Sequence, residues 1–252
     1  MSEFAGQVAL VTGAGAGIGR AICHRLARGG AIVVPTDKHG GRLAEVAGEL
    51  REQWPDGFGM EAVLDIEHRD QFDEVFADVA DKVGPIQIYV WNAALNLPQP
   101  IFDHDPDVFD RIMYANVNNC WYSCARVVEQ MRNAGGGSIT MIGSIAPDVA
   151  ATVREPPYAM SKAAVRALVF GIAKEGGPFN VRCNEIVTGL VTGTRFTDTR
   201  PDRAAASIAE VPLGRLASVE DIAEAVAYLS SDRASFVTGE VLNVSGGLFV
   251  KL

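Results

Sequence analysis

The sequence predicts an α/β fold in which one parallel sheet of seven strands carries helices on both faces. Short apolar, β-branched runs alternate with longer helical patterns, and this alternation is typical of strand–helix–strand crossovers. Several runs are apolar on both faces, as strands are where helices cover both sides of a sheet. The expected strands are 7–12, 31–36, 60–65, 86–91, 138–143, 181–187 and 240–244, and the expected helices are about 17–29, 41–53, 68–83, 106–133, 157–176 and 218–230.

Composition and charge limit the classes of function that the chain can have. Its 252 residues fit a single domain, 1–252, and no repeat, low-complexity tract or linker divides it. The net charge of -9 argues against nucleic acid as a partner, because the phosphates would be repelled. The start has no basic segment followed by an apolar one, and no apolar run approaches the roughly 18 residues of a membrane helix. We therefore expect a cytoplasmic protein without a membrane partner.

The cysteines give no sign of a metal site. Cys23, Cys120, Cys124 and Cys183 are scattered and have no CxxC pair or nearby histidine to complete a ligand set. We expect four reduced, structural thiols and no bound metal.

The first expected strand runs directly into a helix through the glycine-rich stretch VALVTGAGAGIGRAI. Glycine adopts positive φ and lets the backbone approach a ligand closely. The start of the helix offers free N–H groups and a partial positive charge to a pyrophosphate. A glycine string can be a purely structural turn, but the strand–loop–helix context favours dinucleotide binding. The residues expected at the phosphates are Gly13, Gly15, Ala16, Gly17, Ile18 and Gly19.

The second expected strand is followed at its end by Asp37. A carboxylate there accepts hydrogen bonds from the adenosine hydroxyls of NAD and repels the 2′-phosphate of NADP. Its alternative is a turn residue at a strand end. Lys38 follows directly and softens the discrimination, whereas Ala16 in the glycine loop offers no cation to a 2′-phosphate. We predict that NAD is preferred over NADP.

Further motifs follow in order along the chain. They are Asp65 in VLDIEHRD, WNAA (91–94), Asn116 in ANVNN, Ser144 in MIGSIA, YAMSK (158–162), and a tail, PLGRLASVEDIAEAVAYLSSDRASFVTGEVLNVSGG. Together with TGAGAGIG (12–19), these motifs resemble those of the short-chain dehydrogenase/reductase family over nearly the whole chain. The resemblance implies a single-domain Rossmann fold and an oxidoreductase that uses a nicotinamide cofactor.

The resemblance also implies roles for individual residues. Asn116, Ser144, Tyr158 and Lys162 match the catalytic tetrad, although Asn118 and Asn119 lie close to Asn116. Ser144 is expected to bind the substrate oxygen, and Asn116 to hold a water that relays protons from Lys162. The cofactor contacts expected beyond the glycine loop are Asp37, Lys38, Asp65, Ile66, Asn92, Ala93, Ala94, Tyr158, Lys162, Thr188, Gly189, Val191 and Thr192. The helices 106–133 and 157–176 resemble those that form four-helix contacts in the family, so a homotetramer is expected.

Elementary chemistry supports Tyr158 as the acid–base residue. Oxidation of a secondary alcohol removes a hydride from carbon and a proton from oxygen, and tyrosine, with an ordinary pKa of about 10, needs help to take that proton near neutrality. Lys162 is four positions away and so lies on the same helix face. Pro156 and Pro157 favour a helix start just before Tyr158. We expect the ammonium and the positive helix end to lower the pKa of Tyr158.

The chain departs from the family pattern at several positions. Trp91 and Ala94 stand where Asn and Gly are usual, and Thr188 replaces a proline. Gly143 precedes Ser144 where paired serines are common, and Ser245 replaces an aspartate before the final glycine pair. Thr192 and Thr194 both flank Gly193, so the position of the usual threonine is open.

Substrate residues are less defined. The segment 188–217 is the least regular part of the chain and follows the sixth strand, so we expect a substrate lid. The candidate substrate contacts are Ser144, Ala146, Arg154, Tyr158, Gly189 and Arg195, with Pro147 and Glu155 nearby. Arg195, Arg200 and Arg203 form a solvated face or bind an anionic substrate. Trp91, Met141 and Phe196 line an apolar pocket or belong to the core.

We expect an enzyme that interconverts a small-molecule secondary alcohol and a ketone. Two alternatives stay open: a dinucleotide-binding protein of the same fold without turnover, and a relative with other chemistry. An enoyl reductase of this family usually separates Tyr and Lys more widely than Tyr158 and Lys162.

Overall fold

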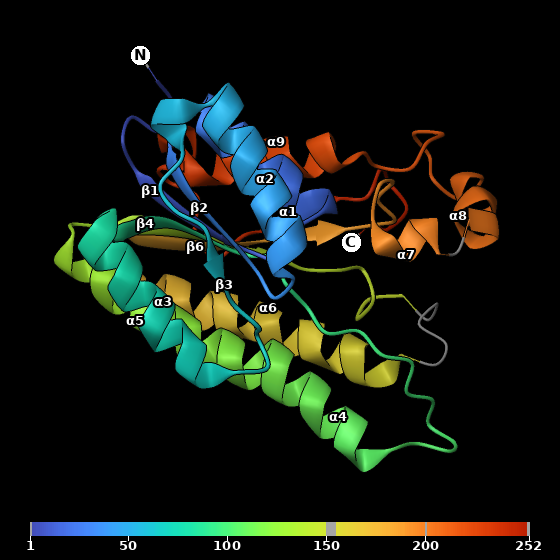
Figure 1. The fold of residues 1–252 in the computed structure, drawn as a ribbon. Coiled ribbons are helices and arrows are strands. Elements are labelled where there is room, and N and C mark those ends of the chain that lie inside the picture. Colours follow the sequence, from blue (N-terminus) through green and yellow to red (C-terminus); the bar gives the residue numbers. More distant parts are fainter. Residues whose placement is uncertain (1, 150–154, 200, 251–252) are drawn as a thin grey trace.

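The computed structural model, which describes residues 2–149, 155–199 and 201–250, is built on one seven-stranded parallel sheet (Figure 1). The strand order is β3-β2-β1-β4-β5-β6-β7, so the direction in which successive strands are added reverses between β1 and β4. This order confirms the predicted fold class. The strands are β1 (Val8–Thr12), β2 (Ile32–Asp37), β3 (Ala62–Val63), β4 (Ile86–Trp91), β5 (Gly137–Ile142), β6 (Val181–Thr188) and β7 (Val241–Val244).

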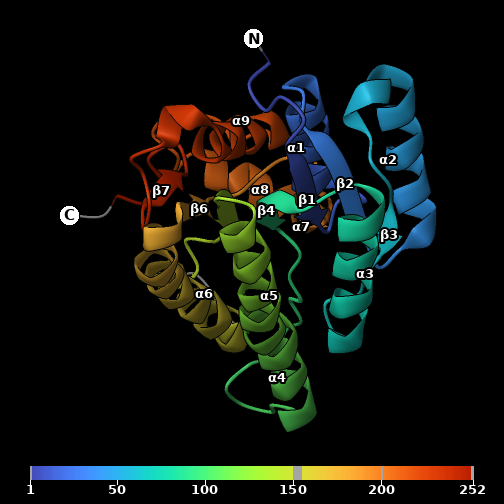
Figure 2. The ribbon, with the colours of Figure 1, turned by 90° about the vertical axis from the view of Figure 1, so that its left-hand side faces the viewer.

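Helices cover both faces of the sheet, as Figure 2 shows from the side. One face carries α1 (Gly17–Arg28), α2 (Gly40–Gln53) and α9 (Val219–Ser230), and the other carries α3 (Arg69–Lys82), α4 (Pro106–Met113), α5 (Asn119–Asn133) and α6 (Pro156–Gly176). Short 3-10 turns at Pro55–Gly57, Gly177–Phe179 and Asp232–Ala234 complete the connections. No helix of the described part of the chain is long and apolar enough to cross a membrane.

The sheet separates two apolar cores. On the α3–α5–α6 side, Trp91 is 1% exposed and its ring stacks on that of Phe72 with centroids 6.1 Å apart. Met141 is buried in the same core. Both side chains therefore pack the interior and do not line a substrate pocket, whereas the side chain of Phe196 lies outside the described residues.

The third strand is shorter than predicted. It pairs with β2 only through Thr36↔Ala62 and Asp37↔Val63, because it is an edge strand. Beyond it, the Asp65 carboxylate accepts a hydrogen bond from Glu67 N at 3.0 Å, which turns the chain away from the sheet. Asp65 therefore lies in a loop rather than in a strand.

The long helix predicted at 106–133 is interrupted. A π-helical turn, Tyr114–Asn118, separates α4 from α5. Such a turn is a local widening of the helix that occurs frequently at functional sites. Here it contains Asn116, so the deviation marks a residue of the predicted tetrad.

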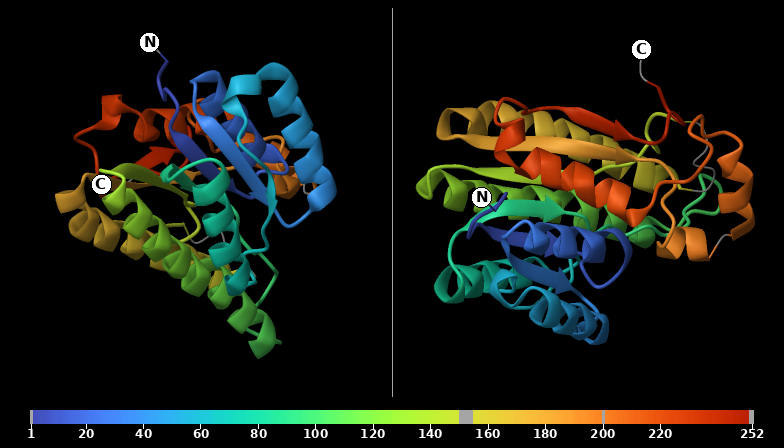
Figure 3. Two further views of the ribbon diagram at one scale, coloured as in Figure 1. Left: turned by 60° about the vertical axis from the view of Figure 1, so that its left-hand side comes forward. Right: turned by 90° about the horizontal axis from the view of Figure 1, so that it is seen from above.

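The segment 188–217 is more regular than predicted. It holds two short helices, α7 (Arg195–Asp198) and α8 (Pro201–Ile208), which project beyond the end of the sheet in the right-hand view of Figure 3. Its two ends are tied together, because Thr192 N donates to Ala217 O at 2.8 Å and Ala217 N donates to Leu190 O at 3.2 Å. The segment is thus a loop with a closed neck.

Candidate active site

The glycine loop connects β1 to α1 at the carboxyl end of the sheet. Gly13 and Gly17 have φ of +66° and +54°, a region that favours glycine. A Cβ at Gly19 would lie 2.1 Å from Gly13 O, so the first turn of α1 packs directly on the loop. The Asn92 amide fixes the loop from β4 by donating to Thr12 O at 2.9 Å and to Gly13 O at 3.0 Å.

The start of α1 has no side-chain cap, since its N-cap residue is Ala16. Its first N–H groups are therefore free to bind an anion, which a helix N-terminus favours. Gly193 packs against the start of α1, because a Cβ at Gly17 would lie 3.1 Å from Gly193 O. The neck of the 188–217 segment thus lies beside the loop that would hold a pyrophosphate.

Asp37 folds back against the glycine loop. Its carboxylate accepts hydrogen bonds from Gly15 N at 3.0 Å and from His39 N at 2.9 Å. A Cβ at Gly15 would come within 2.9 Å of that carboxyl group, so only glycine lets the carboxylate bind the Gly15 N–H without a clash. Lys38 points toward the next strand, where its ammonium lies 3.8 Å from Asp65 and 3.6 Å from Glu67. Lys38 is therefore held by acidic side chains.

These elements surround a cleft of about 370 Å³. Most of the predicted cofactor residues line it, namely Gly13, Ala16, Gly17, Ile18, Asp37, Lys38, Asp65, Ile66, Asn92, Ala93 and Ala94. Five further residues line it that the motifs did not identify as contacts: His39, Leu64, Glu67, Leu95 and Thr194. Each of them stands next to a predicted residue or, for Thr194, to an alternative that the sequence left open. The cleft, the uncapped helix and the Asp37 carboxylate together fit a dinucleotide.

Some predicted cofactor residues lie elsewhere. Thr192 is exposed and its hydroxyl donates to Ala217 O, so Thr194 and not Thr192 faces the cleft. The reason is the bridge at the neck, which orients Thr192 toward Ala217. Val191 is 4% exposed and contributes its carbonyl to the Thr194 hydroxyl at 2.8 Å.

The carboxyl ends of β5 and β6 are joined beside Ser144. Thr188 O accepts from Ile145 N at 3.2 Å, and Gly189 packs against Ser245. Gly15 and Gly19 contact protein atoms, Asp37 and Gly13 respectively, and do not line the cleft.

Three residues of the predicted tetrad meet at the start of α6. Tyr158 and Ser144 are joined by a side-chain hydrogen bond. The Lys162 ammonium lies 5.6 Å from the centroid of the Tyr158 ring and donates to Ile142 O at 2.7 Å. Ala146, a candidate substrate contact, donates its N–H to Ser144 Oγ at 3.1 Å. A phenol, a hydroxyl and an ammonium are thus held together at the end of β5.

The protonation of these groups differs from the prediction. Burial raises the pKa of Tyr158 to about 12, the Glu155 carboxylate acts in the same direction, and the hydrogen bond with Ser144 opposes them. Burial lowers the pKa of Lys162 to about 8, with Cys120 and Glu185 opposing. The expected lowering of the Tyr158 pKa is therefore wrong for the protein alone, because burial and the Glu155 carboxylate outweigh the hydrogen bond with Ser144. At neutral pH the phenol is protonated and is ready to donate a proton.

Asn116 contacts the loop after β4. Its amide accepts from Leu95 N at 2.7 Å and donates to Leu95 O at 2.8 Å and to Ser161 Oγ at 3.1 Å. The side chain therefore fixes Leu95, which lines the cleft, against α6. The neighbouring Asn119 instead donates to Ile66 O, on the other side of the cleft.

Several predicted substrate residues cannot be placed. Arg154 and Arg200 lie outside the described residues, as do the side chains of Arg195 and Arg203. Pro147 and Gly189 are partly exposed beside Ser144 and the neck.

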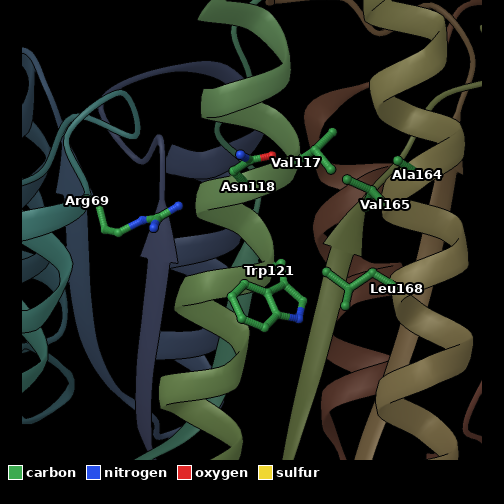
Figure 4. Close-up of a pocket in the computed structure, with 7 residues that line it drawn as sticks. All are labelled: Arg69, Val117, Asn118, Trp121, Ala164, Val165 and Leu168. Atoms are coloured by element: carbon green, nitrogen blue, oxygen red, sulfur yellow. The ribbon is translucent and has the colours of Figure 1, made fainter. Parts of the chain in front are cut away.

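A second hollow, of about 340 Å³, lies away from this chemistry (Figure 4). It is formed between α5 and α6, and Trp121 reaches into it from α5. Trp121 is 57% exposed. The lining includes the apolar side chains Val117, Ala164, Val165 and Leu168, which suits a protein surface better than a polar cofactor.

The fold and the site define the class as a Rossmann-type oxidoreductase. Residues 13–249 match a family model described as enoyl-(acyl carrier protein) reductase. The chain is 33% identical to the 7alpha-hydroxysteroid dehydrogenase of Clostridium sardiniense over 98% of this chain and 95% of that protein. It is 31% identical to a 3-oxoacyl-(acyl-carrier-protein) reductase of Thermotoga maritima over 97% of this chain and 98% of that protein.

A solved structure agrees with these relatives. A short-chain dehydrogenase/reductase from Mycobacterium marinum is 28% identical, with a TM-score of 0.91 over 99% of this chain and 98% of that one. The chain belongs to the short-chain dehydrogenase/reductase family, whose members use nicotinamide cofactors.

Proposed function

We propose that the protein is an NAD-dependent oxidoreductase that interconverts a secondary alcohol and a ketone, with Tyr158 as general acid and base. The observation that carries the proposal is the meeting of Tyr158, Ser144 and Lys162 at the end of β5. A hydride donor or acceptor, which NAD supplies when bound, would have to lie in the adjoining cleft. The relatives named as a hydroxysteroid dehydrogenase and an oxoacyl reductase support an alcohol–ketone pair.

The protein groups divide the work. Ser144 donates a hydrogen bond to the substrate oxygen and stabilises charge that develops there. Tyr158, whose pKa burial raises to about 12, donates its proton to the oxygen of a ketone. In the reverse direction it must lose that proton, which added positive charge beside the ring favours. Lys162 supplies one such charge, and its pKa of about 8 leaves it mostly protonated at neutral pH.

NAD is proposed over NADP because of Asp37. Its carboxylate lies at the end of β2 against the glycine loop, where a 2′-phosphate would be repelled. Lys38 does not offset this charge, because its ammonium lies near Asp65 and Glu67.

The segment 188–217 is proposed as a substrate lid on the 1–252 domain. Its closed neck between Leu190 and Ala217 leaves α7 and α8 to move as a unit beside the cleft. The face around Trp121 is proposed as a contact in a homotetramer, as the family resemblance implies.

A screen for NADH formation tests the proposed reaction. The panel contains cyclic, aromatic and hydroxyacyl alcohols, and the reverse assay contains the ketones and an enoyl thioester. Turnover of an alcohol–ketone pair supports the proposal. Reduction of the enoyl thioester alone would favour the reaction in the family model's description, and bound NAD without turnover would favour a binding protein.

A further inference from the structure

A network of three charged side chains lies beside the proposed catalytic residues and runs from the surface at Asp148, through the half-buried Arg166, to the buried Glu185. The Arg166 guanidinium donates from Nη1 and Nη2 to the two Asp148 oxygens at 2.9 and 2.8 Å, and from Nε to Glu185 Oε2 at 2.9 Å. The side chains of Arg166, Asp148 and Glu185 are 14%, 18% and 0% exposed. The bidentate pair of Arg166 with Asp148 has a specific geometry, because two parallel N–H groups meet the two carboxylate oxygens.

One end of the network holds the turn that carries Ser144. Asp148 N and Val149 N both donate to Ile145 O, at 2.9 and 3.1 Å, and this closes a turn just after Ser144. The Asp148 carboxylate is bound by Arg166, which is on α6 one helical turn beyond Lys162. The Ser144 turn is thus fastened to the helix that carries Tyr158 and Lys162.

The other end of the network explains a departure from the family pattern. A Cβ at Gly143 would lie 1.9 Å from Glu185 Oε1, so a serine cannot stand before Ser144 while Glu185 keeps this position. Glu185 Oε1 is buried and has no hydrogen-bond partner among the described residues. The Glu185 carboxylate therefore packs against the backbone of Gly143 at the end of β5. The neighbouring Ile142 carbonyl accepts the hydrogen bond from Lys162.

Glu185 also acts on Lys162 through its charge. It raises the pKa of that ammonium, as does Cys120 on α5, and both oppose the effect of burial. On its own helix Lys162 faces the Tyr158 ring. Burial raises the pKa of Glu185 and the hydrogen bond from Arg166 lowers it, so Arg166 favours the ionised carboxylate that acts on Lys162.

We propose that Arg166 and Glu185 are positioning residues, which fasten the Ser144 turn to β6 and hold the Lys162 ammonium at Tyr158. This proposal rests on the function proposed above. It also makes Gly143 part of the same arrangement, because the carboxylate takes the space of a side chain at that position. Neither residue has to touch the substrate.

The variants Arg166→Met, Arg166→Lys and Glu185→Gln test this positioning role. Arg28→Met is the control for loss of an arginine ion pair at the surface, since Arg28 forms an exposed 2.7 Å pair with Glu224 on the opposite face of the sheet. We expect Arg166→Met to lower kcat/KM for the alcohol by about 10- to 100-fold, as for a misplaced catalytic group, with NADH affinity unchanged. Arg166→Lys should recover part of the activity, because it keeps the charge but loses the bidentate geometry.

Titration of the Lys162 side chain by NMR gives a readout that needs no substrate. Both variants should lower the Lys162 pKa further: Glu185→Gln removes the charge of the carboxylate, and Arg166→Met removes the hydrogen bond that favours the ionised form of this buried acid. Equal kcat/KM in Arg166→Met and Arg28→Met, or an unmoved Lys162 titration in both variants, would overturn the proposal.

The Gly143 contact gives a second, independent test. Gly143→Ser should lose activity and thermal stability, and Gly143→Ser combined with Glu185→Ala should regain stability relative to Gly143→Ser. Equal melting temperatures for the single and double variants would contradict the packing argument. If the wild-type protein oxidises no alcohol, the proposed function fails by itself, while the Lys162 titration and the Gly143 pair still decide the positioning proposal.

Discussion

Replacement of Asp37 by alanine tests the proposed cofactor preference. The carboxylate is fixed by Gly15 N at 3.0 Å and His39 N at 2.9 Å, so it presents the same oxygens to every ligand that enters the cleft. A hydrogen bond to a charged group contributes about 1.5–3 kcal/mol. Loss of the bonds to the adenosine hydroxyls should therefore raise the KM for NAD by about 10- to 150-fold.

The same change should improve the use of NADP, because the charge that repels its 2′-phosphate is gone. The assay is kcat/KM with each cofactor at a fixed substrate concentration, together with the melting temperature. Asp78→Ala is the control, because Asp78 is 55% exposed on α3 and pairs only with Lys82 among the described residues. A wild-type preference for NADP, or an unchanged cofactor ratio in Asp37→Ala, would refute the reasoning.

Three further predictions follow from the same structure. The rate of alcohol oxidation should increase as pH rises from about 6 to about 9, whereas the rate of ketone reduction should not. Burial raises the pKa of Tyr158, and only oxidation requires the phenol to be deprotonated. Parallel pH profiles in the two directions would contradict this. Trp121→Glu should shift sedimentation from tetramer toward smaller species without unfolding the chain; an unchanged tetramer, or a wild-type monomer, would exclude that face. Ser218→Ala should lower stability by about 1 kcal/mol, because the Ser218 hydroxyl accepts from Asp221 N at the start of α9; denaturant unfolding with an unchanged midpoint would show that the cap contributes nothing.

The seven-stranded parallel sheet and the position of the cofactor cleft could be predicted because they depend on local patterns. Each βα unit shows its strand, its turn and its helix in consecutive residues, and the glycine loop needs only its own sequence context. Parallel strands then bring their carboxyl ends to one edge, so Gly13, Asp37 and Asn92 meet at one cleft.

The features that escaped prediction depend on contacts between distant elements. The shortness of β3 follows from its place at the sheet edge, and the π turn at Asn116 from its bonds to Leu95 and α6. Which of Thr192 and Thr194 faces the cofactor cleft is decided by the bridge between Val191 and Ala217, which the sequence does not reveal.

The protonation of the site also required the three-dimensional structure. Helical spacing places Lys162 beside Tyr158, but the sign of the Tyr158 pKa shift depends on how deeply the phenol is buried. The Arg166 network likewise joins residues from the Ser144 turn, α6 and β6, and only their spacing in the fold shows why Gly143 has no side chain.

The most direct test of the proposed reaction is a comparison of Tyr158→Phe with the wild-type protein on the alcohol that forms NADH fastest. Removal of the phenol hydroxyl should lower kcat/KM by about 10²- to 10⁴-fold, the usual contribution of a general acid–base group. NADH binding, followed by fluorescence, should stay within about threefold, because the substitution removes a single oxygen and leaves the residues that line the cofactor cleft unchanged. Wild-type turnover in the Tyr158→Phe variant would contradict the assignment of Tyr158 as the proton donor and acceptor.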